Sequence, residues 1–512
     1  MRLMQGDERP DQLVDEEGNL LEGGYGWRQR TGLLLGVVLL LATFVSPPLL
    51  GLSPSATKVA WLAVTMAVFW VTEALPIPAT ALFPLVLLPI LGISPMKEAA
   101  TAYADPIIYL FMGGFMLAIA MERWDLHRRI ALNIIHAVGT KPRALILGFL
   151  LSGTFLSMWT SNSATAMMLL PIGISVHGLL RASQGAKGGT VEMGAALVLA
   201  IAYGANIGGM GTLIGTPPNA ILKAFLAKTY GVELGFGQWM LIGVPLILLA
   251  LPPVYLILTR FSFKVGTQEL PGVKEELEIQ RQGLGRITGP EWTVIGAFSL
   301  AIVLWVSREA WKAEVPKTPG ASWPLGALLT DEVIAMGCAS LLFFIPVDLK
   351  KGVFVLDWQS LKKLPWDVLV LFGGGLSLAA AFEKTQLVKA MASGLSVMAS
   401  WPALAIVFLV VAVMIGATAL TSNTATTTAF LPVIGALAVG IDQPAVLLCV
   451  PVAIAASADF ALPVGTPPNA IAFGSGLVSL PRMVKAGLVV DLLFALLIPL
   501  VMWTFGRWAF RL

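Results

Sequence analysis

The chain carries little charge for its length. Of its 512 residues only 12% are charged, whereas 57% are hydrophobic and the mean hydropathy is +0.82. An ordinary soluble domain has about 25% charged residues, so this chain lacks the charge to cover a soluble surface of its size. The sequence therefore predicts an all-α polytopic membrane protein before any motif is considered.

Residues that serve several other chemistries are also scarce. The two cysteines, Cys338 and Cys449, are far apart in apolar runs and predict neither a disulfide framework nor a CxxC site. The three histidines have no metal-binding spacing. A net charge of +3 without a basic, aromatic stripe gives no basis for a nucleic-acid partner. No nucleophile–base pair or metal cluster is apparent, so we expect no enzyme.

What the chain has instead is apolar segments, and a helix needs about 20 residues to cross the hydrocarbon. We expect eleven transmembrane helices, near residues 31–52, 57–75, 77–94, 106–122, 191–214, 238–259, 291–307, 327–346, 365–383, 443–463 and 485–507. Residues 143–181 and 402–440 each hold two apolar arms around a polar centre, and we expect them to be re-entrant hairpins. We expect residues 217–230 and 467–480 to form short helical arms that continue the 191–214 and 443–463 spans after a break.

The distribution of charged residues predicts how the chain is oriented in the membrane. Residues 1–30 form a polar tail, residues 261–290 form a polar loop, and the first loop between spans, 46–56, has no charge. Lysines and arginines follow the fourth, sixth and eighth spans. By the positive-inside rule we expect a multi-pass protein of the cell membrane with a cytoplasmic N-terminus.

The chain contains an internal repeat. With an offset of 261 residues, the segments starting at Phe111 and Phe372 match at 7 of 12 positions, and so do those starting at Thr160 and Thr421. With an offset of 250, all seven residues from Gly215 match. Each half then holds five crossings, and because five is odd the two copies are inverted. Inverted repeats are typical of alternating-access transporters, which bind substrate near mid-membrane at the repeat interface.

Polar motifs interrupt the apolar segments in both halves. An unsatisfied backbone group in lipid costs several kcal/mol, so a break must face protein or a water-filled cavity. Ser and Asn are strong N-caps, and we expect Asn162 and Asn423 to begin the returning arm of each hairpin. In Gly-Thr-Pro-Pro-Asn, Gly215 and Gly465 permit unusual backbone angles and the prolines suit the first turn of a new helix.

Such breaks can bind ions. Free N–H groups at the helix starts attract an anion, and carbonyl oxygens of the incoming halves can ligate a cation. None of the four motifs contains Arg or Lys, so we expect hydroxyls, amides and bound cations to hold the anion. The same residue types also kink or pack membrane helices, but corresponding breaks in both halves favour a binding site. Among the acidic residues, Asp459 is the best candidate for a role beyond capping.

These motifs resemble those of the divalent anion:sodium symporter family, which carries dicarboxylates, citrate and sulfate with sodium. The resemblance covers about residues 31–512 and rests on Ser422-Asn423-Thr424 and the two Gly-Thr-Pro-Pro-Asn breaks. It implies that sodium ions are coupling ions, held at Ser157, Ser161, Asn162 and Gly215 in one site and at Thr418, Thr421, Asn423 and Gly465 in the other. It implies substrate contacts at Asn162, Ser163, Thr216, Pro217, Asn423, Thr424, Thr466 and Pro467.

The same resemblance implies how the protein works. It indicates sodium-coupled symport of C4-dicarboxylates by an elevator, in a homodimer surrounded by lipid. The scaffold would comprise residues 31–142 and 291–401, and the transport domain residues 143–260 and 402–512. Ser163 stands where dicarboxylate carriers usually have Thr, which leaves a sulfate carrier or a sodium-independent dicarboxylate exchanger as alternatives. A channel would need a continuous pore and no dependence of binding on cations.

Overall fold

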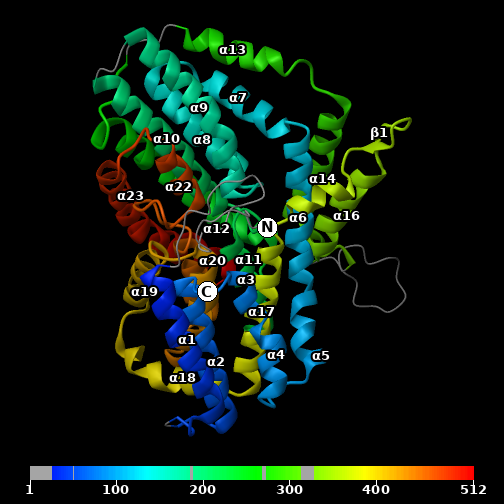
Figure 1. Cartoon of the computed structure of the whole chain (residues 1–512), viewed down its shortest axis with the longest axis vertical. Helices are drawn as coiled ribbons and strands as arrows, with labels where there is room; N and C mark the ends of the chain where they lie inside the picture. The colour runs from blue at the N-terminus through cyan, green and yellow to red at the C-terminus, as the bar shows by residue number, and fades with distance from the viewer. Residues whose placement is uncertain (1–25, 50, 185–187, 268–271, 313–327, 512) are drawn as a thin grey trace, which may run out of the picture.

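The computed structural model describes residues 26–49, 51–184, 188–267, 272–312 and 328–511, and within them the chain is almost entirely helical (Figure 1). The first half contains α1 (Trp27–Val45), α2 (Pro54–Thr72), α3 (Ile77–Ala81), α4 (Phe83–Ile90), α5 (Met96–Thr101), η1 (Ala102–Ala104), α6 (Pro106–Arg123), α7 (Leu126–Val138), α8 (Pro142–Ser157), α9 (Asn162–Gln184), α10 (Gly188–Gly209), α11 (Pro217–Tyr230), α12 (Phe236–Leu256) and η2 (Ile257–Phe261). The second contains α13 (Val273–Gly283), α14 (Gly289–Lys312), α16 (Asp331–Phe344), β1 (Pro346–Asp348), β2 (Val353–Phe354), η3 (Trp358–Lys363), α17 (Trp366–Lys384), α18 (Leu387–Leu395), η4 (Ser396–Ser400), α19 (Ala403–Thr418), α20 (Asn423–Gly440), α21 (Ala445–Ala455), α22 (Pro467–Gly474), α23 (Leu480–Val501), η5 (Met502–Gly506) and α24 (Arg507–Phe510).

The predicted membrane fold is confirmed. Among the described residues, ten helices are long and apolar enough to cross a membrane, or eleven if the pair α18/η4 and α19, bent by 118°, counts as one span. Length and composition also select the hairpin arms α9 and α20, while α16 and α21 are too short to qualify. Length and composition therefore do not distinguish membrane-crossing helices from the arms of re-entrant hairpins. The way in which the helices pair in the fold distinguishes them.

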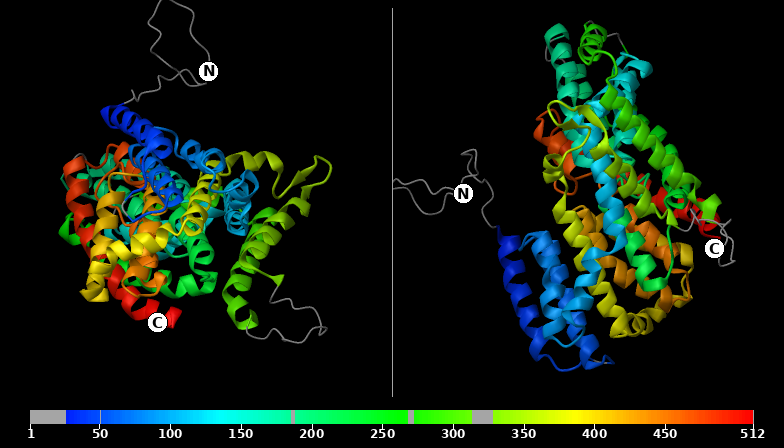
Figure 2. Two further views of the ribbon diagram at one scale, coloured as in Figure 1. Left: turned by 90° about the horizontal axis from the view of Figure 1, so that it is seen from below. Right: turned by 90° about the vertical axis from the view of Figure 1, so that its right-hand side faces the viewer.

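The repeat appears as a matching series of helices. In order, α6 to α12 correspond to α17 to α23, and both α12 and α23 end in a π-helical turn, η2 and η5. The hairpin of α8 and α9 lies toward one end of the molecule, and the hairpin of α19 and α20 toward the other (Figures 1 and 2). This arrangement follows from an odd number of crossings in each half.

Close approach of helices explains the glycines of α6 and α17. A Cβ at Gly113 would lie 2.6 Å from the backbone of Ala335 in α16, and one at Gly374 would overlap the backbone of Ala81 in α3. Without side chains these helices pack at short distance, as small residues permit in membranes. The glycines thus build the framework and contribute no ligand.

Two amphipathic helices link these spans to the hairpins. Between α6 and α8 lies α7, and between α17 and α19 lies α18. Each begins directly after a non-glycine residue in the left-handed region, Asp125 with φ of 51° and Gln386 with φ of 59°. These two residues are 261 positions apart, which is the offset of the repeat. The chain therefore makes the same sharp turn in both halves.

A buried ion network fixes α11 against α14 and α16. The Asp331 carboxylate is fully buried and lies 2.6 Å from Lys223 Nζ and 3.1 Å from Arg308 Nη1. Its backbone carbonyl accepts a hydrogen bond of 3.0 Å from Trp305 Nε1, and Trp305 stacks on Phe236 with ring centroids 4.3 Å apart. Since α11 starts at one of the helix breaks, this network positions that break.

We expect Asp331→Ala to be strongly destabilising. Removing one partner of a buried ion pair leaves an uncompensated charge and costs about 3–5 kcal/mol. Here Arg308 loses its buried partner, and Lys223 keeps only Glu332 at 3.4 Å. The melting temperature of the detergent-purified protein should fall sharply. Glu98→Ala is the matched control, because the Glu98–Lys384 pair is exposed and such pairs contribute about 0–1 kcal/mol. Equal melting temperatures for the two variants would contradict a structural role for the network.

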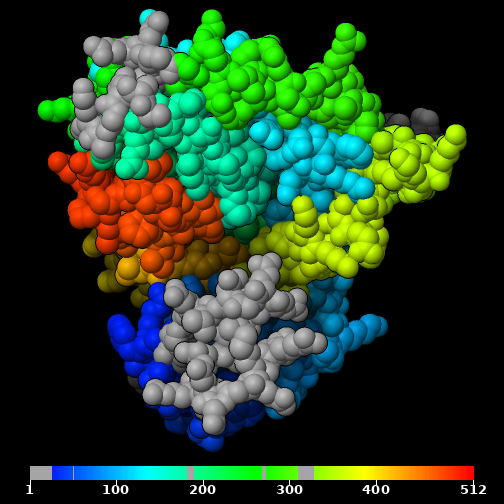
Figure 3. Space-filling model, turned by 45° about the horizontal axis from the view of Figure 1, so that its top comes forward, coloured from blue at the N-terminus to red at the C-terminus, as the bar shows by residue number. Residues whose placement is uncertain are grey.

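The structure adds elements that the polar segments did not predict. The loop expected at 261–290 contains the amphipathic helix α13, which packs against α7 and α9 at one end of the molecule. Figure 3 shows this end, with α13 in green beside α7 in cyan. A short antiparallel pair, β1 and β2, follows α16. The predicted tail of residues 1–30 lies mostly outside the described residues, and α1 begins at Trp27.

Candidate functional site

The two hairpin tips have the same local structure. The returning helices α9 and α20 begin at Asn162 and Asn423, as predicted from the Thr-Ser-Asn motifs. Ser157 Oγ lies 2.7 Å from Asn162 Oδ1, and Thr418 Oγ1 lies 2.7 Å from Asn423 Oδ1. Each asparagine is therefore held from behind by a hydroxyl at the end of the incoming arm, five residues earlier in the chain.

Oxygen atoms surround both asparagines. The Asn162 amide faces Ser157 Oγ at 2.7 Å and the carbonyl oxygens of Ala205 and Gly215, each at 3.3 Å. When the amide nitrogen is turned toward them, its two hydrogens can be donated to two of these three oxygens. Thr418 Oγ1 also lies 2.8 Å from the Ala456 carbonyl. A hydroxyl has one hydrogen to donate, so Thr418 satisfies at most one of its two oxygen neighbours. Both tips thus bring several electron-rich oxygens together.

The helix breaks are braced identically in both halves. Asn219 Nδ2 donates to the carbonyls of Gly209 at 3.0 Å and Thr212 at 2.7 Å. Asn469 Nδ2 donates to the carbonyls of Asp459 at 3.1 Å and Leu462 at 3.0 Å. Both donors and both acceptors are related by the offset of 250 residues. The last residue of Gly-Thr-Pro-Pro-Asn therefore closes the loop that ends the incoming half-helix.

One side chain joins the two halves. Asn206 of α10 is fully buried and its Nδ2 lies 3.0 Å from Thr466 Oγ1 and 3.2 Å from Asn469 Oδ1. Thr466 in turn caps α22 by accepting from the N–H of Asn469 at 3.4 Å. The break in the second half is thus bonded directly to the span that carries the first break.

The tips and breaks converge on one cavity of about 570 Å³. Its lining includes residues from both tips and both breaks, together with Glu73, Phe115, Pro365, Asp367 and Val368. No lysine or arginine is among the described residues that line it. Four helices, α9, α11, α20 and α22, begin at this cavity and direct their N-terminal dipoles toward it.

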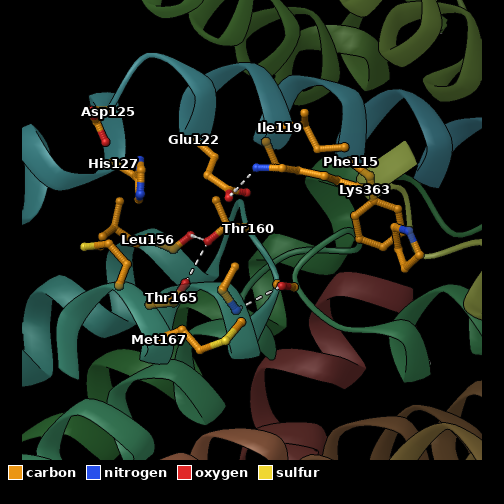
Figure 4. A pocket seen from close by; sticks show the side chains of 15 residues that line it. Phe115, Ile119, Glu122, Asp125, His127, Leu156, Thr160, Thr165, Met167 and Lys363 are labelled. Atoms are coloured by element: carbon orange, nitrogen blue, oxygen red, sulfur yellow. Dashed lines mark hydrogen bonds and ion pairs between the residues drawn. The ribbon is translucent and has the colours of Figure 1, made fainter. Parts of the chain in front are cut away.

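A second cavity of about 680 Å³ adjoins the first (Figure 4). Both cavities have Phe115, Ser161 and Pro365 in their walls. In the second one, Lys363 reaches to Glu122 with a separation of 3.2 Å, and Thr160 and Thr165 of the first hairpin bond each other at 2.7 Å. The two cavities are therefore neighbours on either side of the tip of the first hairpin.

Comparison with known proteins agrees with this arrangement. The family described as the sodium:sulfate symporter transmembrane region matches residues 28–512. The chain belongs to the sodium:sulfate symporter family. It is 39% identical over 508 residues to a protein of Staphylococcus saprophyticus named sodium-dependent dicarboxylate transporter SdcS, covering 98% of this chain and 96% of that protein. The protein of the same name from Staphylococcus aureus is 38% identical over 480 residues, covering 93% and 91%.

Two solved structures share the fold of this symporter-family chain. Neisseria gonorrhoeae MtrF aligns with a TM-score of 0.60 at 12% identity and covers 95% of both chains. The Alcanivorax borkumensis YdaH transporter aligns with a TM-score of 0.57 at 14% identity and covers 89% of this chain and 99% of its own. At these identities the likeness supports the architecture and the family membership supports a transporter, not an enzyme.

The structure brings the predicted site residues together. The predicted substrate contacts that line the 570 Å³ cavity are Asn162, Ser163, Thr216, Pro217, Asn423, Thr424, Thr466 and Pro467, and the predicted cation ligands Ser161, Gly215 and Gly465 line it too. Ser157 and Thr418 lie behind the two asparagines. The Thr421 hydroxyl turns away to Thr426 at 2.5 Å, which leaves its backbone carbonyl as the predicted ligand. No role was predicted for Asn206, Asn219 or Asn469, although Asn219 and Asn469 are the last residues of the two Gly-Thr-Pro-Pro-Asn motifs.

Proposed function

We propose that this chain is a sodium-coupled symporter of C4-dicarboxylates such as succinate, malate and fumarate. The observation that carries the proposal is the single cavity lined by two inverted pairs of motifs, with helix starts and carbonyls but no basic side chain. A dianion in such a cavity needs positive charge from co-bound cations. The name of the staphylococcal relatives, sodium-dependent dicarboxylate transporter, supports both the cation and the substrate class.

Sodium would occupy the oxygen clusters at the two tips. In the first site, the Asn162 amide oxygen, which faces Ser157 in this structure, would join Ser157, Ser161 and the Gly215 carbonyl as a ligand. The ligands of the second site would be Thr418, the Thr421 carbonyl, Asn423 and Gly465. Hard cations prefer oxygen ligands, and the hydroxyl and carbonyl groups found there are of that type.

The dicarboxylate would bind between the two cations. Its carboxylates would contact Asn162 and Ser163 on one side and Asn423 and Thr424 on the other, with Thr216, Pro217, Thr466 and Pro467 completing the walls. Helix N-termini stabilise a negative charge by about 0.3–1 kcal/mol each, and more when partly buried. Four such termini and two cations together supply the attraction that basic side chains provide in other anion sites.

Alternating access would occur by an elevator mechanism. We propose that residues 143–260 and 402–512 move as the transport domain against a scaffold of residues 31–142 and 291–401. The 680 Å³ cavity is lined by residues at the end of α6 and the start of α7, the region expected to face the cytoplasm, which supports a site accessible from that side. The family resemblance further supports a homodimer in the cell membrane, with its N-terminus in the cytoplasm.

Uptake by proteoliposomes tests this function. We expect uptake of labelled succinate to fall at least tenfold when external sodium is replaced by choline, because the dianion loses the charges that neutralise it. Unlabelled fumarate and malate should compete strongly, and sulfate weakly. Equal uptake in sodium and choline would contradict coupling and favour a dicarboxylate exchanger. Strong competition by sulfate alone would make the chain a sulfate carrier.

A further inference from the structure

Asp459 is a buried carboxylate without a cationic partner in the part of the chain that the structure describes. Its side chain is fully buried between α21 and α22, and neither of its oxygens accepts a hydrogen bond. The backbone N–H groups of Ala461 and Leu462 lie beside the carboxylate without meeting hydrogen-bond geometry. Unlike Asp459, the equally buried Asp331 has two cationic partners. Because an isolated buried charge is very costly, a carboxylate in this position must either take up a proton or gain a positively charged partner.

The repeat shows where this carboxylate points. Asn219 and Asn469 brace the two breaks through equivalent carbonyls, and in that pattern Asp459 occupies the position of Gly209. A Cβ at Gly209 would lie 2.5 Å from Asn162 Oδ1, the amide of the first proposed cation site. The same backbone position in the second half therefore aims a side chain toward the second proposed cation site.

The contacts around Asp459 agree with this direction. Its Oδ2 fills the space that a Cβ of Gly465 would take, and Gly465 is a proposed ligand of the second cation. The Ser457 hydroxyl, also fully buried, has no hydrogen-bond partner either. Among the described residues no lysine, arginine or histidine forms an ion pair with Asp459. The space freed by glycine thus holds an anionic oxygen beside the proposed ligands.

We propose that Asp459 is an anionic ligand of the second cation site, which makes this site chemically different from the first. The inference rests on the proposed function, since it concerns the same sodium ions. A carboxylate is a strong ligand for a hard cation, and charge-assisted contacts are about twice as strong as neutral ones. The second site would therefore fill at a lower sodium concentration than the first, before the dicarboxylate binds.

The nearby Asp491 provides a matched control. Asp491 of α23 is also buried, but its Oδ1 accepts a hydrogen bond of 2.9 Å from the N–H of Phe460. It braces the same loop, and it does not line the 570 Å³ cavity. Asn in place of either aspartate keeps the size of the side chain and removes its charge, so the two variants separate a missing ligand from a general loss of buried charge.

The test is a sodium titration of the purified full-length protein without substrate, read as the rise in melting temperature. We expect Asp459→Asn to raise the half-saturating sodium concentration of the tighter phase about tenfold, and Asp491→Asn to leave it within about twofold. Succinate uptake by Asp459→Asn should recover at high sodium. Superimposable titrations for wild type and Asp459→Asn would overturn the inference while leaving sodium coupling intact. If the wild type shows no sodium effect in titration or uptake, the proposed function itself fails.

Discussion

Asn423→Ala is expected to abolish succinate uptake while leaving the protein folded. The Asn423 amide belongs both to the second cation cluster, through Thr418 at 2.7 Å, and to the wall of the substrate cavity. A hydrogen bond to a charged group contributes about 1.5–3 kcal/mol, so the loss of both contacts should lower uptake by about 100-fold or more. Initial rates in proteoliposomes at saturating sodium measure the effect.

The matched control for that variant is Asn133→Ala. Asn133 is exposed on α7 and lines neither cavity. The same substitution there should leave uptake unchanged. If Asn423→Ala retains wild-type uptake, the tip of the second hairpin does not belong to the substrate site.

Gly465→Ala should cause a similarly large loss, and a second substitution should reverse part of it. The new methyl group would occupy the space of Asp459 Oδ2, which is closed in by buried neighbours. Overpacking of this kind costs about 1–3 kcal/mol, and it would displace the carboxylate from the cation site. We therefore expect uptake to fall at least tenfold in Gly465→Ala.

The double variant Asp459→Ala/Gly465→Ala removes the collision. We expect it to regain the thermal stability of the wild type and to transport succinate, but only at raised sodium concentration, because one ligand is gone. Gly474→Ala, where a Cβ meets no atom within 4 Å, serves as the control for a glycine substitution in α22. A double variant no better than Gly465→Ala would show that the two residues are not coupled.

The sequence predicted most of the fold because its signals were local or repeated. Apolar segments long enough to cross a membrane identified the spans, and the matching motifs at Asn162 and Asn423 identified the hairpin tips. The Thr-Ser-Asn motifs marked the starts of α9 and α20, although Ser161 and Ser422 precede the first helical residue there and the asparagines do not act as caps. The starts of α11 and α22 followed from proline at the first helical turn. These features depend on residues near one another in the chain.

Other features depended on packing that no local pattern encodes. Asn206 has no counterpart in the second half, where Ala456 stands, so the repeat gave no reason to single it out. The network of Lys223, Arg308 and Asp331 joins residues that are far apart in sequence. For Asp459 the sequence indicated only an unusual acidic residue, and the direction of its side chain required the braced loop seen in the structure.

The paired left-handed turns at Asp125 and Gln386 bear on the energetics of transport. If the hairpins travel with the transport domain, α7 and α18 must pivot where they meet α6 and α17, and backbone angles of this kind cost about 1–3 kcal/mol each. Because the repeat relates the two joints by inversion, we expect their strain to change in opposite directions along the stroke. Strain of this kind affects the rate of the stroke, whereas the direction of net flux is set by the electrochemical gradients of the ions and substrate.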